Sequence, residues 1–87
     1  MSKKMQFKSI HFVTICGHPK KTREWECRDN WTEWILGKVK WYEPLQQYCF
    51  FPNADVYSPG CLEDIAVFIR SLNHERRIAV LLKKGSS

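Results

Sequence analysis

The 87-residue sequence has no long hydrophobic run, no Cys-x-x-Cys pair and only four glycines. No segment approaches the roughly 20 apolar residues that a membrane-spanning helix needs, so we expect no membrane partner. Lysines precede the apolar stretch 10–16, but His11 and Thr14 interrupt it, and no small-residue cleavage site follows. This pattern argues against a secretory signal peptide. We therefore predict a cytoplasmic protein whose thiols stay reduced.

The lack of paired cysteines also argues against a metal site. Structural zinc sites usually carry cysteines two to four residues apart, whereas here only Cys16 and His18 are close. The other candidate ligands are Cys27, Cys49, Cys61, His11 and His74. Because buried cysteine is a common small core residue, and Cys49 and Cys61 lie on core-like segments, we predict no metal and no cofactor.

Catalytic patterns are absent as well. The sequence has no glycine-framed nucleophile, no phosphate-binding glycine loop and no paired-acid motif. Glu63 and Asp64 are adjacent, but a place near the positive end of a helix dipole explains them. We predict that the protein is not an enzyme.

Fourteen basic residues against nine acidic ones give a net charge of +5. This charge favours a polyanion or an acidic protein surface as partner, without separating the two. The four Trp, three Tyr and five Phe supply enough apolar area for one modest core. We predict a single domain over residues 1–87, with flexible ends at 1–5 and 83–87, and find no internal repeat.

The expected fold is α+β, a four-stranded antiparallel meander with one C-terminal helix packed on one face. Strands are predicted at 6–16, 23–28, 32–42 and 46–51, because β-branched and aromatic residues alternate there between turn signals. In the third strand, alternation predicts one face with Ile35, Gly37, Val39 and Trp41, and the opposite face with Trp34, Leu36, Lys38, Lys40 and Tyr42. Gly37 within this strand indicates a bulge or a close backbone approach.

The helix prediction begins with Ser58 as N-cap and Pro59 at the first helical position. Its apolar stripe contains Leu62, Ile65, Ala66, Ile69 and Leu72, widened by Cys61 and Phe68. Continuing the helix would place Arg76 on this stripe, so a break is predicted at 73–75. For residues 78–82 three alternatives stay open: an extra edge strand, a second short helix, or a tail that pairs with another subunit in a homodimer.

Basic and aromatic residues interleave on the predicted solvent side of the third strand, at Lys38, Lys40 and Tyr42. Lys20, Lys21 and Arg23 are candidates to extend this patch toward phosphates. The aromatic motif of the common RNA-binding sheet is absent. We predict a non-catalytic module that binds a macromolecule through its open sheet face, with nucleic acid slightly favoured by charge.

The alternative is a protein interaction module or an inhibitor of a host protein. One helix cannot cover all of Trp25, Trp31, Trp34, Trp41 and Tyr42, so some Trp should be exposed. Exposed Trp and Tyr often anchor interfaces, and Trp34 is the candidate contact. The surplus aromatics could instead pack under the tail or within a homodimer.

Two segments carry a resemblance to a known family: LGKVKWYEPLQQYCFFP at 36–52 and SPGCLEDIAVFIRSLN at 58–73. They resemble a family of short proteins encoded by bacteriophages and bacterial mobile elements, over about residues 22–76. The matching positions are Gly37, Trp41, Tyr42, Pro44, Tyr48, Cys49, Phe50, Phe51, Pro52, Cys61, Leu62, Asp64 and Ile65. Glu43 and Leu45 depart from the pattern, so no ligand contact is carried over at this turn. The resemblance implies an accessory protein acting inside a bacterium, which binds host machinery or DNA without catalysis.

Overall fold

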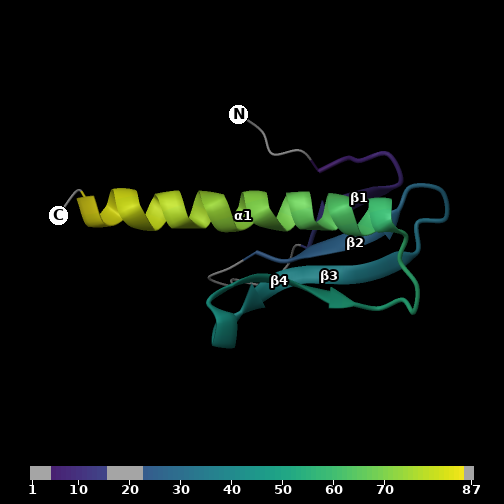
Figure 1. Cartoon of the computed structure of the whole chain (residues 1–87), viewed down its shortest axis with the longest axis horizontal. Coiled ribbons are helices and arrows are strands. Elements are labelled where there is room, and N and C mark those ends of the chain that lie inside the picture. The colour runs from purple at the N-terminus through teal and green to yellow at the C-terminus, as the bar shows by residue number, and fades with distance from the viewer. Residues whose placement is uncertain (1–4, 16–22, 86–87) are drawn as a thin grey trace.

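The computed structural model describes residues 5–15 and 23–85, with side chains up to residue 79. Its elements are β1 (Ile10–Thr14), β2 (Trp25–Asp29), β3 (Ile35–Tyr42), the short 3-10 helix η1 (Glu43–Leu45), β4 (Gln47–Pro52) and α1 (Pro59–Gly85). The strands form one antiparallel sheet in the order β1-β2-β3-β4, and α1 lies along one face of it (Figure 1). The predicted α+β meander with a C-terminal helix is confirmed. Within the described residues, no helix combines the length and apolar character needed to cross a membrane.

The first strand is shorter than predicted, because residues 5–9 fold back on β1. Gln6 bridges His11, the amide of Phe12 donates to the carbonyl of Met5 at 2.9 Å, and Phe7 is buried. Met5, which we placed in a flexible end, is therefore held to β1. The remaining residues of that end, 1–4, lie outside the described part of the chain.

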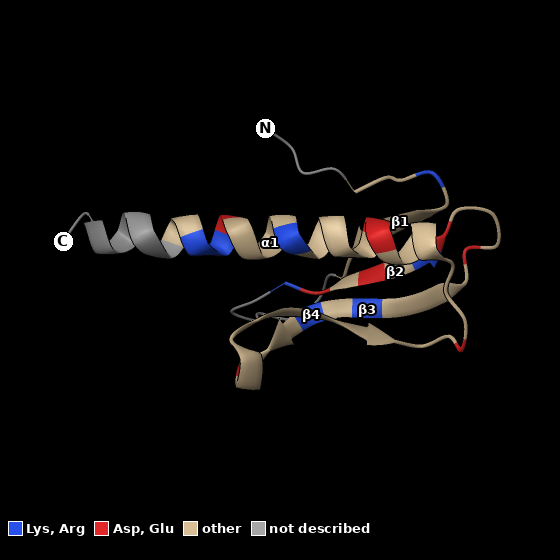
Figure 2. Ribbon diagram, in the orientation of Figure 1, with Lys and Arg blue, Asp and Glu red and all other residues tan. Residues whose placement is uncertain are grey.

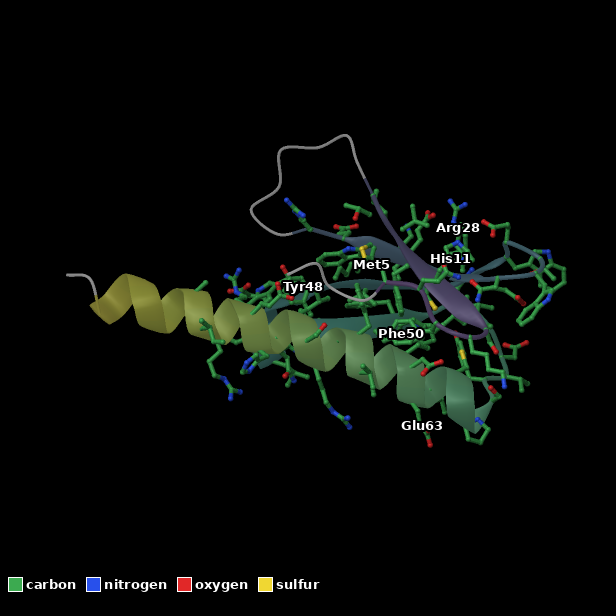
Figure 3. All side chains as sticks on the ribbon, turned by 90° about the horizontal axis from the view of Figure 1, so that it is seen from above. Met5, His11, Arg28, Tyr48, Phe50 and Glu63 are labelled. Carbon is green, nitrogen blue, oxygen red and sulfur yellow. The ribbon has the colours of Figure 1, made fainter. Side chains whose placement is uncertain are left out.

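The core lies between α1 and the sheet, and Phe68 is at its centre. The Phe68 ring stacks on Phe12 of β1 with centroids 3.9 Å apart and meets Trp25 of β2 edge-on at 5.6 Å. The buried stripe of α1 consists of Cys61, Ile65, Phe68 and Leu72, at helical spacing. Figure 3, which looks down on α1, shows Tyr48 and Phe50 reaching from β4 into the same region. Leu62, predicted on the stripe, is 49% exposed, because it follows Cys61 and points about 100° away from that side chain around the helix.

A bulge in β3 corrects the predicted faces of this strand. Cys27 pairs with Gly37 but Arg28 pairs with Ile35, so β3 carries one extra residue, as Gly37 indicated. The extra residue reverses the alternation upstream of Gly37. Ile35 is therefore exposed opposite Arg28, and Leu36 packs against the core, so both predicted assignments were wrong.

Gly37 also provides the predicted close approach. A Cβ atom at this position would lie 2.4 Å from Cζ of Phe50 and 2.7 Å from the carbonyl oxygen of Phe51. The absence of a side chain thus allows the Phe50 ring to cross β3.

Two hydroxyl groups fix the start of α1. The Ser58 hydroxyl accepts a hydrogen bond from the amide of Cys61 at 3.1 Å, which confirms the predicted N-cap. The Tyr57 hydroxyl donates to the carbonyl of Leu36 in the bulge and accepts from the amides of Asn53 and Ala54, each at 3.1 Å. The loop before the helix is therefore tied to β3.

The predicted break at 73–75 is wrong, because the polar residues on the stripe find partners on the sheet. Asn73 pairs with the backbone of Tyr48: its Oδ1 accepts from the amide at 2.7 Å, and its Nδ2 donates to the carbonyl at 3.3 Å. The Arg76 guanidinium lies over the Trp41 ring, 4.2 Å from its centroid. Residues 78–82 are therefore part of α1, whose C-terminal end overhangs the sheet (Figure 1).

Replacing Gly37 with Ala should lower the free energy of unfolding by about 1–3 kcal/mol, because the new methyl group would overlap a ring and a backbone oxygen. Gly60→Ala is the matched control, since nothing lies within 4 Å of its added Cβ and the position is helical. It should be neutral or stabilise the protein by up to about 1 kcal/mol. Urea denaturation measures both values, and equal effects would contradict the close approach at Gly37.

Asn73→Ala should cost about 1–3 kcal/mol, because it leaves the amide of Tyr48 without its side-chain acceptor. His74→Ala, at the neighbouring exposed position, should stay within about 0.5 kcal/mol of wild type. Thermal unfolding followed by circular dichroism compares the two. A loss of stability at His74 as large as that at Asn73 would refute the pairing of the helix with β4.

Candidate nucleic-acid interface

The sheet face opposite α1 carries a row of basic and aromatic side chains. Strand register pairs Lys38 with Phe51, Lys40 with Cys49 and Tyr42 with Gln47, so these side chains share the face away from the core. Lys38 and Tyr42 are exposed, whereas Lys40 and Phe51 are half-buried. We call Lys38, Lys40, Tyr42 and Phe51 the β3 face.

Contacts within the β3 face order its side chains. Nζ of Lys40 lies 4.5 Å from the centroid of the Phe51 ring, within the range of a cation–π interaction. Tyr42 meets the same ring edge-on, with centroids 5.9 Å apart. One aromatic ring therefore positions both a cation and a second ring.

Next to the β3 face, Arg28 forms ion pairs with acidic side chains, so the lysines carry the net positive charge of this face. Arg28 donates to Oε1 of Glu26 from Nη2 at 2.6 Å and from Nε at 3.0 Å, and its Nη1 lies 3.7 Å from Glu33. The hydrogen bonds that Arg28 donates to Glu26 are the main reason why the pKa of Arg28 is raised. In the described part of the chain, neither Lys38 nor Lys40 forms an ion pair. Their charges thus stay available to an anion.

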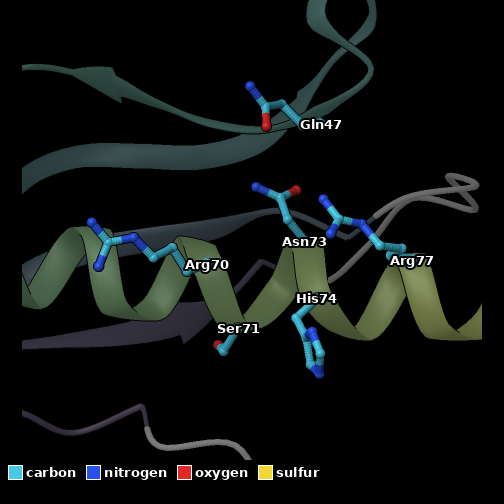
Figure 4. A pocket seen from close by; sticks show the side chains of 6 residues that line it. All are labelled: Gln47, Arg70, Ser71, Asn73, His74 and Arg77. Atoms are coloured by element: carbon cyan, nitrogen blue, oxygen red, sulfur yellow. The ribbon is translucent and has the colours of Figure 1, made fainter.

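A polar hollow adjoins the β3 face around the edge of β4 (Figure 4). It has a volume of about 530 Å³ and is lined by Gln47, Arg70, Ser71, Asn73, His74 and Arg77. Gln47 is the register partner of Tyr42, so the hollow begins where the β3 face ends. Arg70 and Arg77 are exposed and bring two further positive charges to this edge. We call it the β4-edge hollow.

The structure brings together only some of the predicted contact residues. Lys38, Lys40 and Tyr42 share the β3 face. Arg23 lies on the other side, where it lines a hollow with Trp25, Tyr48 and Arg76 beneath α1. Trp34 is 72% exposed but belongs to the turn before β3, upstream of the bulge. Lys20 and Lys21 lie outside the described residues.

Sequence reasoning missed Phe51, Arg70 and Arg77. The run Tyr48–Phe51 is aromatic or apolar throughout, so its alternation does not reveal which ring faces outward. Arg70 was placed on the polar side of the helix, but its position beside the edge of β4 depends on how α1 crosses the sheet.

Cys27 and Cys61 are buried core residues whose environment suits a packing role. Burial raises the pKa of the Cys27 thiol to about 12, with a smaller effect from neighbouring Cys61, and burial also raises the pKa of Cys61. Neutral thiols in a core are poor nucleophiles and poor ligands. No group of three or more Cys, His, Asp or Glu side chains gathers there into a metal-binding arrangement. Cys16 and His18 lie outside that part.

Comparison with protein-family models, curated proteins and solved structures gives no match to this chain. The resemblance to phage and mobile-element proteins therefore rests on its sequence motifs alone.

Thiol labelling should distinguish the core cysteines from Cys49, which is half-exposed on the open face. At pH 8, a pKa of about 12 in place of 9.0 leaves roughly 1,000-fold less thiolate at Cys27, in addition to its burial. A short pulse of iodoacetamide followed by peptide mass spectrometry should modify Cys49 and spare Cys27 and Cys61 until denaturant is added. Labelling of Cys27 at the rate of Cys49 in the folded protein would contradict this assignment.

Proposed function

We propose that the protein is a non-catalytic module that binds single-stranded nucleic acid through the β3 face. The observation that carries the proposal is that Lys38, Lys40, Tyr42 and Phe51 share a sheet face over which no described element packs. Lysines attract phosphates, and exposed rings offer stacking surfaces to bases.

The shape of this surface favours single strands over duplex. Four strands about 4.8 Å apart span roughly 14 Å, whereas the major groove is about 12 Å wide and admits a helix or a two-stranded ribbon. The whole face therefore does not fit into the groove. Unpaired bases, in contrast, can turn toward Tyr42 and Phe51 while their phosphates reach the lysines.

The β4-edge hollow extends the positive surface. A strand that crosses the β3 face toward Gln47 meets Arg70 and Arg77 next, and these planar guanidinium groups suit phosphate oxygens. The net charge of +5 supports the same partner class.

The family resemblance supports a setting inside a bacterium, as an accessory protein of a phage or mobile element. Docking of a host protein on the same face is less favoured. Only Tyr42 is an exposed aromatic there, because Trp31 and Trp34 lie in the turn between β2 and β3.

Fluorescence anisotropy with a labelled 20-nucleotide oligo-dT tests the proposal. Lys38→Ala and Lys40→Ala should each weaken binding and reduce the slope of log K against log salt by about 0.7, the value for one phosphate contact on a single strand. Lys8→Ala is the matched control, because it removes one exposed lysine outside this face and should leave the slope unchanged.

Tyr42→Ala should separate stacking from charge. It should weaken binding by about 1–3 kcal/mol with little change in the salt slope. Salt-independent binding of the wild type, or an equal effect of Lys8→Ala and Lys38→Ala, would rule out the β3 face as the interface.

A further inference from the structure

A second exposed surface lies at the end of the molecule where α1 begins. Trp31 is 74% exposed and Trp34 72% exposed in the turn between β2 and β3, and Val56 is 83% exposed in the loop before α1. Figure 1 shows this turn and this loop at the same end. A hollow of about 330 Å³ joins them and is lined by Trp31, Val56, Leu36, Tyr57 and others. We call Trp31, Trp34 and Val56, with this hollow, the tryptophan end.

Hydrogen bonds hold the turn of the tryptophan end in place. Oδ1 of Asp29 accepts from the amide of Trp31 at 2.9 Å, and Oγ1 of Thr32 accepts from the amide of Trp34 at 3.2 Å. The side-chain Nδ2 of Asn30 donates to the carbonyls of Phe7 and Lys8 at 2.8 and 3.0 Å. Two large rings are thus presented to solvent on a fixed backbone, which lowers the entropy lost when they bind.

Acidic residues lie in the turn and the loop of the tryptophan end and in the first turns of α1. They are Asp29, Glu33, Asp55, Glu63 and Asp64. Glu33 is near His11 and Arg28, but no ion pair involves Asp55, Glu63 or Asp64 in the part of the chain described. Figure 3 shows Glu63 pointing outward from α1. The chemistry that fits this surface is an apolar segment with basic neighbours.

The opposite end of the same chain has this chemistry. Residues 76–84 read Arg-Arg-Ile-Ala-Val-Leu-Leu-Lys-Lys, an apolar run between two basic pairs. Among the residues of α1 whose side chains are described, up to 79, Leu72 is the last that is buried, and the helix continues to Gly85, roughly 20 Å further. Ile78, on this overhang, is 42% exposed. In Figure 2 the described basic residues of α1 lie from its middle toward this end, where Glu75 precedes Arg76, and most of the acidic residues lie at the other end.

We propose that the tryptophan end of one copy binds the C-terminal helix segment 76–84 of a second copy. The two surfaces differ and lie at opposite ends of a molecule whose longest extent is 47 Å. The contact is therefore head-to-tail, and each dimer keeps one unused surface of each kind. Because one helix end on one turn is smaller than the roughly 800 Å² per partner of a standard interface, the association depends on concentration.

Sedimentation equilibrium of two complementary variants tests the proposal. The head variant is Trp31→Ala with Asp55→Lys, and the tail variant is Ile78→Glu with Lys83→Glu. Trp31, Asp55 and Ile78 are exposed, so circular dichroism should show both variants folded. The apparent mass of the wild type should rise from the 10.4 kDa of the monomer to above that of a dimer as the protein concentration increases. Each variant alone should remain a monomer.

A 1:1 mixture of the two variants should form a dimer and stop there, because only one intact head and one intact tail remain. Val67→Glu is the control for the added charge, since Val67 is 49% exposed in the middle of α1, and this variant should associate like wild type. A wild type that is monomeric at all concentrations would overturn the proposal. A wild type that stops at a dimer, with the head variant alone still a dimer, would instead show a symmetric tail-to-tail contact and would also overturn it. The experiment uses protein free of nucleic acid, so its outcome is independent of oligonucleotide binding.

Discussion

The packing of Phe68 against Phe12 and Trp25 is the contact on which the rest of this structure depends. These three rings join the middle of α1 to the first two strands, and Phe68 is 1% exposed. At the opposite edge of the sheet, the side chain of Asn73 forms hydrogen bonds with the backbone of β4. A helix held at both positions lies along one face of the sheet, and no described element packs over the opposite face.

The bulge at Gly37 determines what that open face presents. Downstream of it, the alternation places Val39 in the core and Lys38, Lys40 and Tyr42 outside. Upstream of it, Leu36 turns toward the core, and its carbonyl receives the Tyr57 hydroxyl. One extra residue thus joins the strand with the lysines to the loop that starts the helix. It also separates the β3 face from the tryptophan end.

Much of this architecture can be predicted from local patterns. Turn residues and alternation predict four strands, and Ser58 and Pro59 mark the helix start. The excess of tryptophan predicts that some Trp is exposed, and Trp31 and Trp34 are. The errors arise where distant residues decide the outcome. Arg76 was taken to be incompatible with the apolar stripe, yet Trp41 provides a ring for it. Ile35 was assigned to the wrong face because the glycine indicated a bulge, but not whether the alternation would change before or after Gly37. The β4-edge hollow combines side chains from β4 and α1, and their crossing is not encoded in either segment alone.

The most direct test of the open face as the binding surface is a nuclear magnetic resonance titration of the ¹⁵N-labelled protein with a 12-nucleotide oligo-dT. We predict chemical-shift changes at Lys38, Lys40, Tyr42 and Phe51, extending to Gln47 and Arg77, with little change along the buried stripe of α1. Changes confined to the turn that carries Trp31 and Trp34, or an absence of changes at low salt, would contradict this assignment.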